Sequence, residues 1–161
     1  MRNRVAVYPG FFDPFTMGHL NIVERIACVF DEVVISVASA SPKNALFSLD
    51  DRVKMIKEAV SGHNGIYVET FDGLLMEYVK QNNYPVIVRG LRTVSDYEYE
   101  FQMAQANRTL DPQVETFFMV TAPQYSYLSS TLIKEIARLG GNISSMVPQA
   151  VLKKMEKVKQ S

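Results

Sequence analysis

Three segments of the sequence combine glycine with histidine, arginine or hydroxyl side chains in spacings suited to phosphate binding. In residues 9–19, Gly10 is followed by Phe-Phe-Asp-Pro, and a Thr-x-Gly-His group ends at His19. Glycine lets a backbone approach a ligand, and the free N–H groups at a helix start favour an anion. His19, in the first turn of a helix opening near Gly18, would then project toward a bound phosphate. A tight turn with a structural histidine is the alternative interpretation.

The second segment is Arg89-Gly90-Leu91-Arg92, which the hydrophobic pattern places directly after a strand. Two guanidinium groups there flank a glycine. Arginine binds phosphate through paired N–H donors, and glycine again lets the backbone come close. Surface ion pairs are the alternative role for these arginines. Glu100 lies in the acidic helix that follows. From the sequence alone, it reads as a solvated helix residue.

The third segment is rich in hydroxyl groups and precedes a predicted helix. It consists of Tyr125, Ser126, Tyr127, Leu128, Ser129, Ser130 and Thr131. Hydroxyls at a helix start can cap the helix and can also bind phosphate oxygens. Capping accounts for one hydroxyl, whereas this run offers three in succession. Two other residues, Lys43 and Leu75, read from the sequence alone as a solvated lysine and a core leucine.

All three segments follow strands of one predicted α/β domain that spans residues 1–161. Strands are expected at 5–8, 33–38, 66–70, 85–88 and 115–120, and helices at 18–30, from 48 onward, 73–81, 95–110, 130–139 and 148–158. Ser48 with Asp51, and Ser95 with Glu98, are predicted to cap two of these helices. The alternating order implies a doubly wound, five-stranded parallel sheet of the Rossmann-like kind. Ligands of such sheets bind beyond the C-terminal strand ends, where the three segments lie.

Composition excludes several classes of protein. Lys plus Arg and Asp plus Glu are both 17 in 161 residues, so the net charge is zero and no nucleic-acid partner is expected. No apolar run approaches the ~20 residues that span a bilayer, and the N-terminus shows no signal-peptide pattern. Cys28 is the one cysteine, which suits a reducing cytoplasm. No Cys/His spacing indicates a metal site.

The motifs together resemble a known family. Gly-x-Phe-Asp-Pro with Thr-x-Gly-His resembles the signature of the nucleotidyltransferase superfamily, and Arg-Gly-Leu-Arg before Tyr-Glu-Tyr-Glu resembles phosphopantetheine adenylyltransferases in particular. The resemblance covers the whole chain. It implies direct in-line transfer of the adenylyl group of ATP to 4'-phosphopantetheine, giving dephospho-coenzyme A and pyrophosphate. It also implies Mg²⁺ as cofactor, a cytoplasmic location and a homohexamer.

The resemblance implies roles for individual residues. His19 would stabilise the pentavalent transition state at the α-phosphate, with Lys43 and Arg92 completing the catalytic set. The acceptor would lie against Phe11, Lys43, Leu75 and Arg89. The residues implied for ATP binding are Phe11, Phe12, His19, Gly90, Leu91, Arg92, Glu100, Tyr125, Ser126, Tyr127, Leu128, Ser129, Ser130 and Thr131.

Phe11 departs from the family pattern, which has threonine or serine at this position. The backbone contact survives that change but the hydroxyl contact does not, at a cost of about tenfold in binding or rate. We expect the Phe11 ring to pack near Phe12 or Phe15, leaving its N–H toward phosphate. Two alternatives stay open: another small-molecule adenylyl- or cytidylyltransferase, and a nucleotide-sensing module without catalysis. A class I aminoacyl-tRNA synthetase would need a Lys-Met-Ser-Lys-Ser loop, which this chain lacks.

Overall fold

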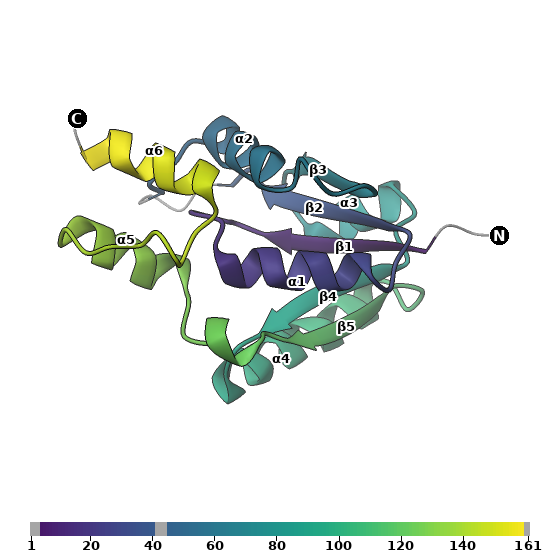
Figure 1. Cartoon of the computed structure of the whole chain (residues 1–161). Helices are drawn as coiled ribbons and strands as arrows, with labels where there is room; N and C mark the ends of the chain where they lie inside the picture. The colour runs from purple at the N-terminus through teal and green to yellow at the C-terminus, as the bar shows by residue number, and fades with distance from the viewer. Residues whose placement is uncertain (1–3, 41–44, 160–161) are drawn as a thin grey trace.

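The computed structural model describes residues 4–40 and 45–159, with side chains to Lys157. Its strands are β1 (Val5–Gly10), β2 (Glu32–Ala38), β3 (Ile66–Phe71), β4 (Val86–Leu91) and β5 (Glu115–Val120). Its helices are α1 (Met17–Ala27), α2 (Leu49–Ala59), α3 (Leu75–Gln81), α4 (Val94–Leu110), α5 (Ser130–Arg138) and α6 (Gln149–Lys159), with a 3₁₀ turn η1 (Pro123–Tyr125). The strands form one five-stranded sheet in the order β3-β2-β1-β4-β5 (Figure 1). Every neighbouring pair is parallel, so the predicted fold class is confirmed.

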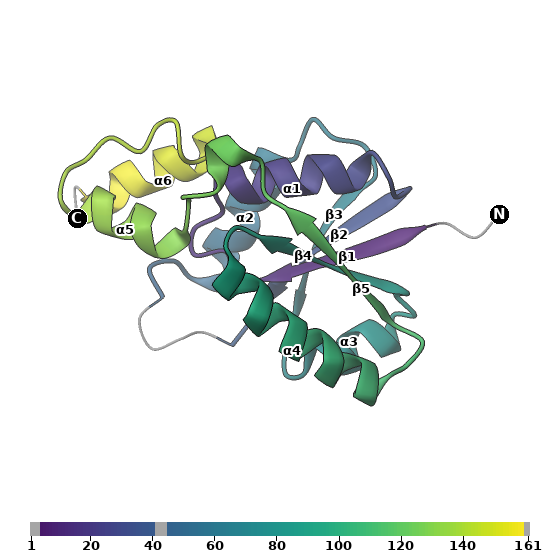
Figure 2. The same ribbon diagram turned by 90° about the horizontal axis from the view of Figure 1, so that it is seen from below.

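Helices cover both faces of the sheet. Helices α1 and α2 lie on one face, and α3 and α4 lie on the other (Figure 2). The chain winds from β1 in the centre to β3 at one edge, then returns to β4 on the other side of β1. The topological switch point therefore lies between β1 and β4, where ligands of such sheets bind. Helices α5 and α6 extend past the C-terminal strand ends (Figure 1).

The centre of the sheet is hydrophobic because both of its faces are covered. Strand β2 buries five residues in succession, with only its two end residues partly exposed. Continuous apolar runs of this kind are typical of parallel strands packed between helix layers. Strand β1 lies between β2 and β4 in this sheet, so the packed core holds the C-terminal ends of β1 and β4 in place.

The predicted end of one strand and the predicted cap of one helix were wrong for identifiable reasons. Strand β4 continues through Leu91 instead of ending at residue 88, because its ladder with β5 persists to the pair Leu91 and Val120. Residues 89–91 are thus part of the strand. Helix α4 is capped by Thr93, whose hydroxyl accepts from the Asp96 N–H at 3.1 Å. Ser95 lies inside the first turn and cannot cap it, whereas Ser48 caps α2 as predicted.

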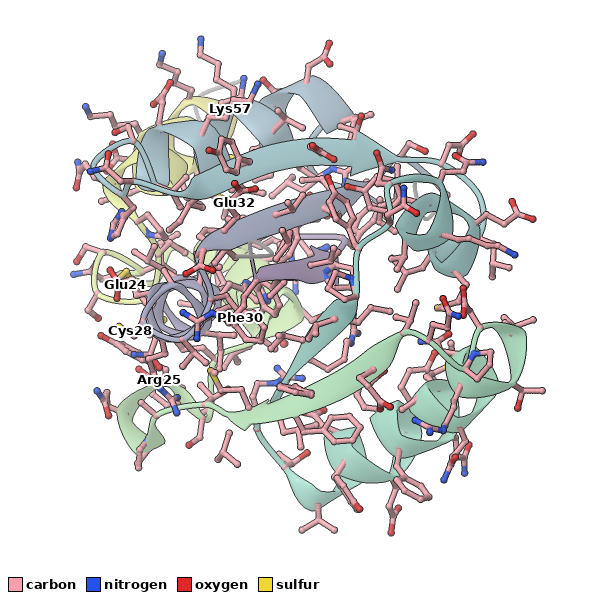
Figure 3. All side chains as sticks on the ribbon, turned by 90° about the vertical axis from the view of Figure 1, so that its right-hand side faces the viewer. Glu24, Arg25, Cys28, Phe30, Glu32 and Lys57 are labelled. Atoms are coloured by element: carbon pink, nitrogen blue, oxygen red, sulfur yellow. The ribbon has the colours of Figure 1, made fainter. Side chains whose placement is uncertain are left out.

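Cys28 lies at the end of the molecule where the strands begin. Figure 3 views this end and shows Cys28 near Glu24 and Arg25 at the end of α1. The Cys28 thiol is exposed and donates to the Glu24 carbonyl at 3.4 Å. The switch-point end lies on the opposite side, so this thiol has no contact with it. Within the described residues, no helix is long and apolar enough to cross a membrane.

Candidate functional site

A pocket of about 330 Å³ opens at the C-terminal ends of the central strands. It brings together residues from all three segments singled out in the sequence. They include Phe11, Phe12, His19, Arg89, Gly90, Arg92, Leu128, Ser129, Ser130 and Thr131, and Glu100 of α4 lines the pocket as well. Pro9, Gly10, Thr16 and Gly18 of the first segment also line it. The lining further includes Tyr8, Asp96 and Thr121, to which sequence reasoning assigned no role.

Several residues from the family-implied set do not line this pocket. Leu91, Tyr125, Ser126 and Tyr127 are absent from its wall. Leu75 lines a smaller neighbouring pocket together with Arg89 and Glu100. Because Arg89 and Glu100 line both pockets, the two adjoin at this ion pair. Lys43 lies outside the described residues.

His19 is held by a reciprocal pair of hydrogen bonds at the start of α1. The Thr16 N–H donates to His19 Nδ1 at 3.0 Å, and the Thr16 hydroxyl accepts from the His19 N–H at 3.2 Å. Because Nδ1 accepts from a backbone N–H, the proton of the neutral ring must sit on Nε2. Nε2–H is therefore the donor that His19 has left for a ligand in the pocket.

The surroundings of His19 keep its ring neutral. Burial, followed by the positive charges of Arg92 and Arg89, lowers the pKa of His19 to about 3. Its ring stacks on Phe15 at a centroid distance of 5.5 Å and meets the edge of Phe12 at 5.1 Å. At neutral pH His19 consequently offers a fixed hydrogen-bond donor rather than a cation.

Gly10 lines the pocket and also makes room for a neighbouring side chain. A Cβ atom at Gly10 would lie 2.6 Å from the Phe12 ring, so the ring would have to move. Phe12 has a φ of 54° and is 4% exposed, so its ring folds back under the loop. Gly10 thus has a packing role. Because it also lines the pocket, its expected role in bringing the backbone close to a ligand stays a prediction.

The Phe11 ring does not pack on Phe12 or Phe15 as expected. It lies over the guanidinium of Arg52, whose central carbon is 4.1 Å from the ring centroid. Arg52, in α2, is 1% exposed and donates to the carbonyl oxygens of Phe11 at 2.7 Å and Ala38 at 3.0 Å. The Phe12 ring already contacts Tyr8, Phe15 and His19, which leaves it little free surface for Phe11.

An ion pair with a buried carboxylate holds the same loop from the other side. Asp13 is 3% exposed and accepts from the N–H groups of Leu46 and Phe47, each at 2.9 Å. Lys134 of α5 lies 2.9 Å from the same carboxylate. The loop after β1 is therefore fastened to α5 and to the segment leading into α2. Asp13 lies within the Phe-Phe-Asp-Pro motif and Lys134 shortly after the third segment, but the sequence gave no sign that they pair.

The two arginines of β4 and the following loop are each paired with a carboxylate of α4. Arg89 forms a two-pronged ion pair with Glu100 and also donates to the Pro9 carbonyl at 2.8 Å. Arg92 pairs with Asp96 at 3.0 Å and donates to the Leu128 carbonyl at 2.9 Å. Both arginine side chains line the pocket and are partly exposed, at 29% and 37%. Each arginine therefore links two walls of the pocket and still has surface for an anion.

The three serine hydroxyls of the third segment already have partners in the protein. Ser129 caps α5 by accepting from the Leu132 N–H at 3.0 Å. Ser130 donates to the Pro14 carbonyl at 2.8 Å, and Ser126 donates to the Pro123 carbonyl at 2.9 Å. The Thr131 side chain is exposed at the pocket wall. The end of this segment and the first turn of α5 thus form one wall of the pocket, and its serine hydroxyls bond within the protein.

Comparison with known proteins identifies a family and relatives of this chain. A family model described as cytidylyltransferase-like matches residues 7–136. The phosphopantetheine adenylyltransferase of Geotalea daltonii is 50% identical over 153 residues, which are 95% of each chain. That of Geobacter metallireducens is 51% identical over 94% of this chain and 93% of its own. That of Caldanaerobacter subterraneus subsp. tengcongensis is 50% identical over 98% of this chain and 99% of its own.

A solved structure shares the fold at low sequence identity. It is a bifunctional NMN adenylyltransferase/ADP ribose pyrophosphatase from Francisella tularensis, with a TM-score of 0.77 and 14% identity. The match covers 99% of this chain and 51% of that one. At this identity the likeness concerns the fold alone.

Proposed function

The chain belongs to the phosphopantetheine adenylyltransferase family, and we propose that it transfers the adenylyl group of ATP to 4'-phosphopantetheine, giving dephospho-coenzyme A and pyrophosphate. The observation that carries this proposal at the site is the fixed tautomer of His19. Its Nδ1 accepts from Thr16, so its Nε2–H is left for the pocket that Arg92 also lines. A neutral donor and a cation lining one pocket match the charge that develops on a phosphate under attack.

The reaction needs positioning more than acid–base chemistry. An oxygen of the acceptor phosphate attacks the α-phosphorus of ATP, in line with the bond to the β-phosphate. That bond breaks, and pyrophosphate leaves with its electron pair. The acceptor phosphate is already ionised at neutral pH, so no general base is required and no covalent enzyme intermediate forms.

We assign the nucleotide to the main pocket. His19 Nε2–H would donate to an α-phosphate oxygen and Arg92 would neutralise the neighbouring phosphates. The backbone of Gly90 and the wall from Leu128 to Thr131 would hold the rest of the nucleotide. This assignment is supported by the shared lining of the pocket.

We assign the acceptor to the adjoining side. Leu75 and Arg89 line the smaller pocket, together with Tyr99 and Met103. Arg89 belongs to both pockets, so it would meet the acceptor phosphate where the two substrates approach each other. Lys43 and the backbone N–H of Phe11 would complete this end.

Mg²⁺ would arrive with ATP rather than occupy a site of its own. The two pocket carboxylates, Asp96 and Glu100, are each paired with an arginine. Within the described residues, no group of three or more acidic, histidine or cysteine side chains could hold a metal ion. Phosphate oxygens and water suit this hard ion, which neutralises phosphate charge when bound.

A homohexamer is the proposed assembly. Helix α4, which is described in full, buries none of its residues. Large apolar side chains are exposed along α4 and β5: Val94, Tyr97, Tyr99, Phe101, Met103, Leu110, Phe117 and Val120. An apolar surface of this extent is typical of a protein interface. Light scattering should give about six times the 18.2 kDa of one chain, and a single-chain mass would contradict this. We place the enzyme in the cytoplasm, with which its one exposed free thiol is compatible.

The test of the proposed reaction is pyrophosphate release from ATP with a panel of acceptors. We expect release with 4'-phosphopantetheine and much less with nicotinate mononucleotide. Turnover with the second acceptor alone would favour another small-molecule nucleotidyltransferase. ATP binding without release for any acceptor would favour the sensing module.

A further inference from the structure

Tyr8 of β1 places a phenol at the floor of the main pocket. It is 5% exposed and belongs to the pocket lining. Its ring packs against Phe12 at a centroid distance of 5.6 Å and lies 6.5 Å from the His19 ring. A ring held between a strand and these neighbours has little freedom, so the fold sets where its hydroxyl lies.

The Tyr8 hydroxyl has no partner among the described residues. No hydrogen bond contributes to its electrostatic environment, which consists of burial and the charges of Arg89, Arg92 and Glu100. In the described part of the chain, the buried side-chain polar atoms without a hydrogen-bond partner are Asn21 Oδ1, Arg52 Nε and His63 Nδ1. The Tyr8 oxygen is not one of them, so it is open to the pocket. Tyrosine hydroxyls that are largely buried usually find a partner, and a ligand would supply one here.

Gly90 keeps this hydroxyl accessible. A Cβ atom at Gly90 would lie 3.4 Å from the Tyr8 hydroxyl oxygen and 3.4 Å from Ile22 Cγ1. A side chain at this point would therefore cover the hydroxyl by ordinary van der Waals contact. Gly90 lies in β4 beside β1, so the opening falls at the switch point of the sheet.

The charges near Tyr8 favour an anionic acceptor. Burial raises the pKa of Tyr8, and Arg89 and Arg92 oppose this only in part. The phenol thus keeps its proton at neutral pH and can donate. A donor beside two guanidiniums is placed to meet a negatively charged oxygen.

We propose that the Tyr8 hydroxyl donates a hydrogen bond to a phosphate oxygen of the bound nucleotide, as a further donor beside His19 Nε2 and Arg92. The inference rests on the proposed function for the identity of the nucleotide. It requires only that ATP binds in this pocket, and it assigns Tyr8 to substrate binding.

The test compares ATP with adenosine on the Tyr8→Phe variant, which loses the hydroxyl and keeps the ring. Calorimetry should show ATP affinity falling by about tenfold or more, as for a hydrogen bond to a charged group. Adenosine affinity should stay unchanged because adenosine has no phosphate. An equal loss of affinity for ATP and adenosine would mean that the Tyr8 hydroxyl contacts the sugar or the base. An unchanged affinity for ATP would mean that the hydroxyl does not contact the nucleotide. Either result overturns the proposal.

Tyr78→Phe is the matched control. The Tyr78 hydroxyl donates to Glu69 and accepts from Ser36, and Tyr78 does not line the pocket. Its loss should lower Tm and leave ATP affinity unchanged. Tyr8→Phe should instead lower ATP affinity and leave Tm equal to or above that of the wild type. A drop in Tm matching that of Tyr78→Phe, without loss of ATP affinity, would make the Tyr8 hydroxyl structural. Pyrophosphate release by the wild type is measured in parallel, since its absence would remove the proposed function but not the binding test.

Discussion

The guanidinium of Arg52 lies 4.1 Å from the centroid of the Phe11 ring and donates to the Phe11 carbonyl at 2.7 Å. One buried side chain thus holds both the backbone and the ring of the residue that departs from the family pattern. The ring is drawn toward α2, which explains how phenylalanine fits where threonine or serine is usual. Stacking of this kind contributes about 0.5–2 kcal/mol.

Replacing Arg52 by alanine should destabilise the protein. The carbonyl oxygens of Phe11 and Ala38 would lose their donor inside the structure, at a cost of roughly 2 kcal/mol or more. Urea unfolding measures the change. Lys57→Ala, at an exposed position of the same helix, is the control and should have little effect. Equal stability of the two variants would contradict the anchoring role of Arg52.

Phe11→Thr should lower stability and raise activity. Loss of the stacking on Arg52 should lower the free energy of unfolding by about 1 kcal/mol. The threonine hydroxyl should raise the rate by up to about tenfold. Chemical denaturation and steady-state kinetics report the two effects separately. A wild type without turnover, rescued only by this substitution, would show that the phenylalanine ring obstructs the site.

His19→Ala should lower kcat by about 10²-fold or more with a small change in KM, because the Nε2–H is proposed to act in the transition state. His63→Ala provides the comparison, since His63 Nε2 lies 3.3 Å from Glu24 Oε1 and His63 does not line the main pocket. Near-normal turnover of the His19 variant would remove it from the mechanism.

The lowered pKa of His19 predicts a definite pH dependence. A folded-state pKa of about 3 lies below the unfolded value near 6.5, so the native state resists protonation. The stability that neutral His19 contributes is present above pH 6.5 and is lost as the pH falls toward 3, at no more than about 1.4 kcal/mol per pH unit. NMR should show the His19 ring neutral from pH 8 to pH 5. A midpoint near 6.5 would mean that the ring is neither desolvated nor affected by the arginines.

Arg89→Ala should weaken binding of 4'-phosphopantetheine more than binding of ATP. Arg89 lines both pockets, and its loss also leaves Glu100 without its partner. Calorimetry on Arg89→Ala and on Glu100→Gln separates these effects, since the second variant keeps the arginine. Equal loss of both ligands in Arg89→Ala would indicate a structural role or a role in ATP binding.

The sequence predicted the fold because its strands are continuous apolar runs and its helices have clear starts. It also predicted which segments meet, since parallel strands end at one edge of the sheet. It could not predict the partners of buried polar groups. Arg52 occupies an ordinary helical position, and only the packed structure shows it between the ends of β1 and β2. Tyr8 reads as one more strand residue until the missing side chain of Gly90 exposes its hydroxyl.

Transfer of label from ATP tests the central claim most directly. The protein is incubated with 4'-phosphopantetheine, Mg²⁺ and ATP labelled at the α-phosphorus, and the products are separated and identified by mass spectrometry. We predict that the label appears in dephospho-coenzyme A in step with pyrophosphate release, and that His19→Ala suppresses both together. Bound ATP whose label never leaves the nucleotide, in wild-type protein with both substrates present, would contradict the account.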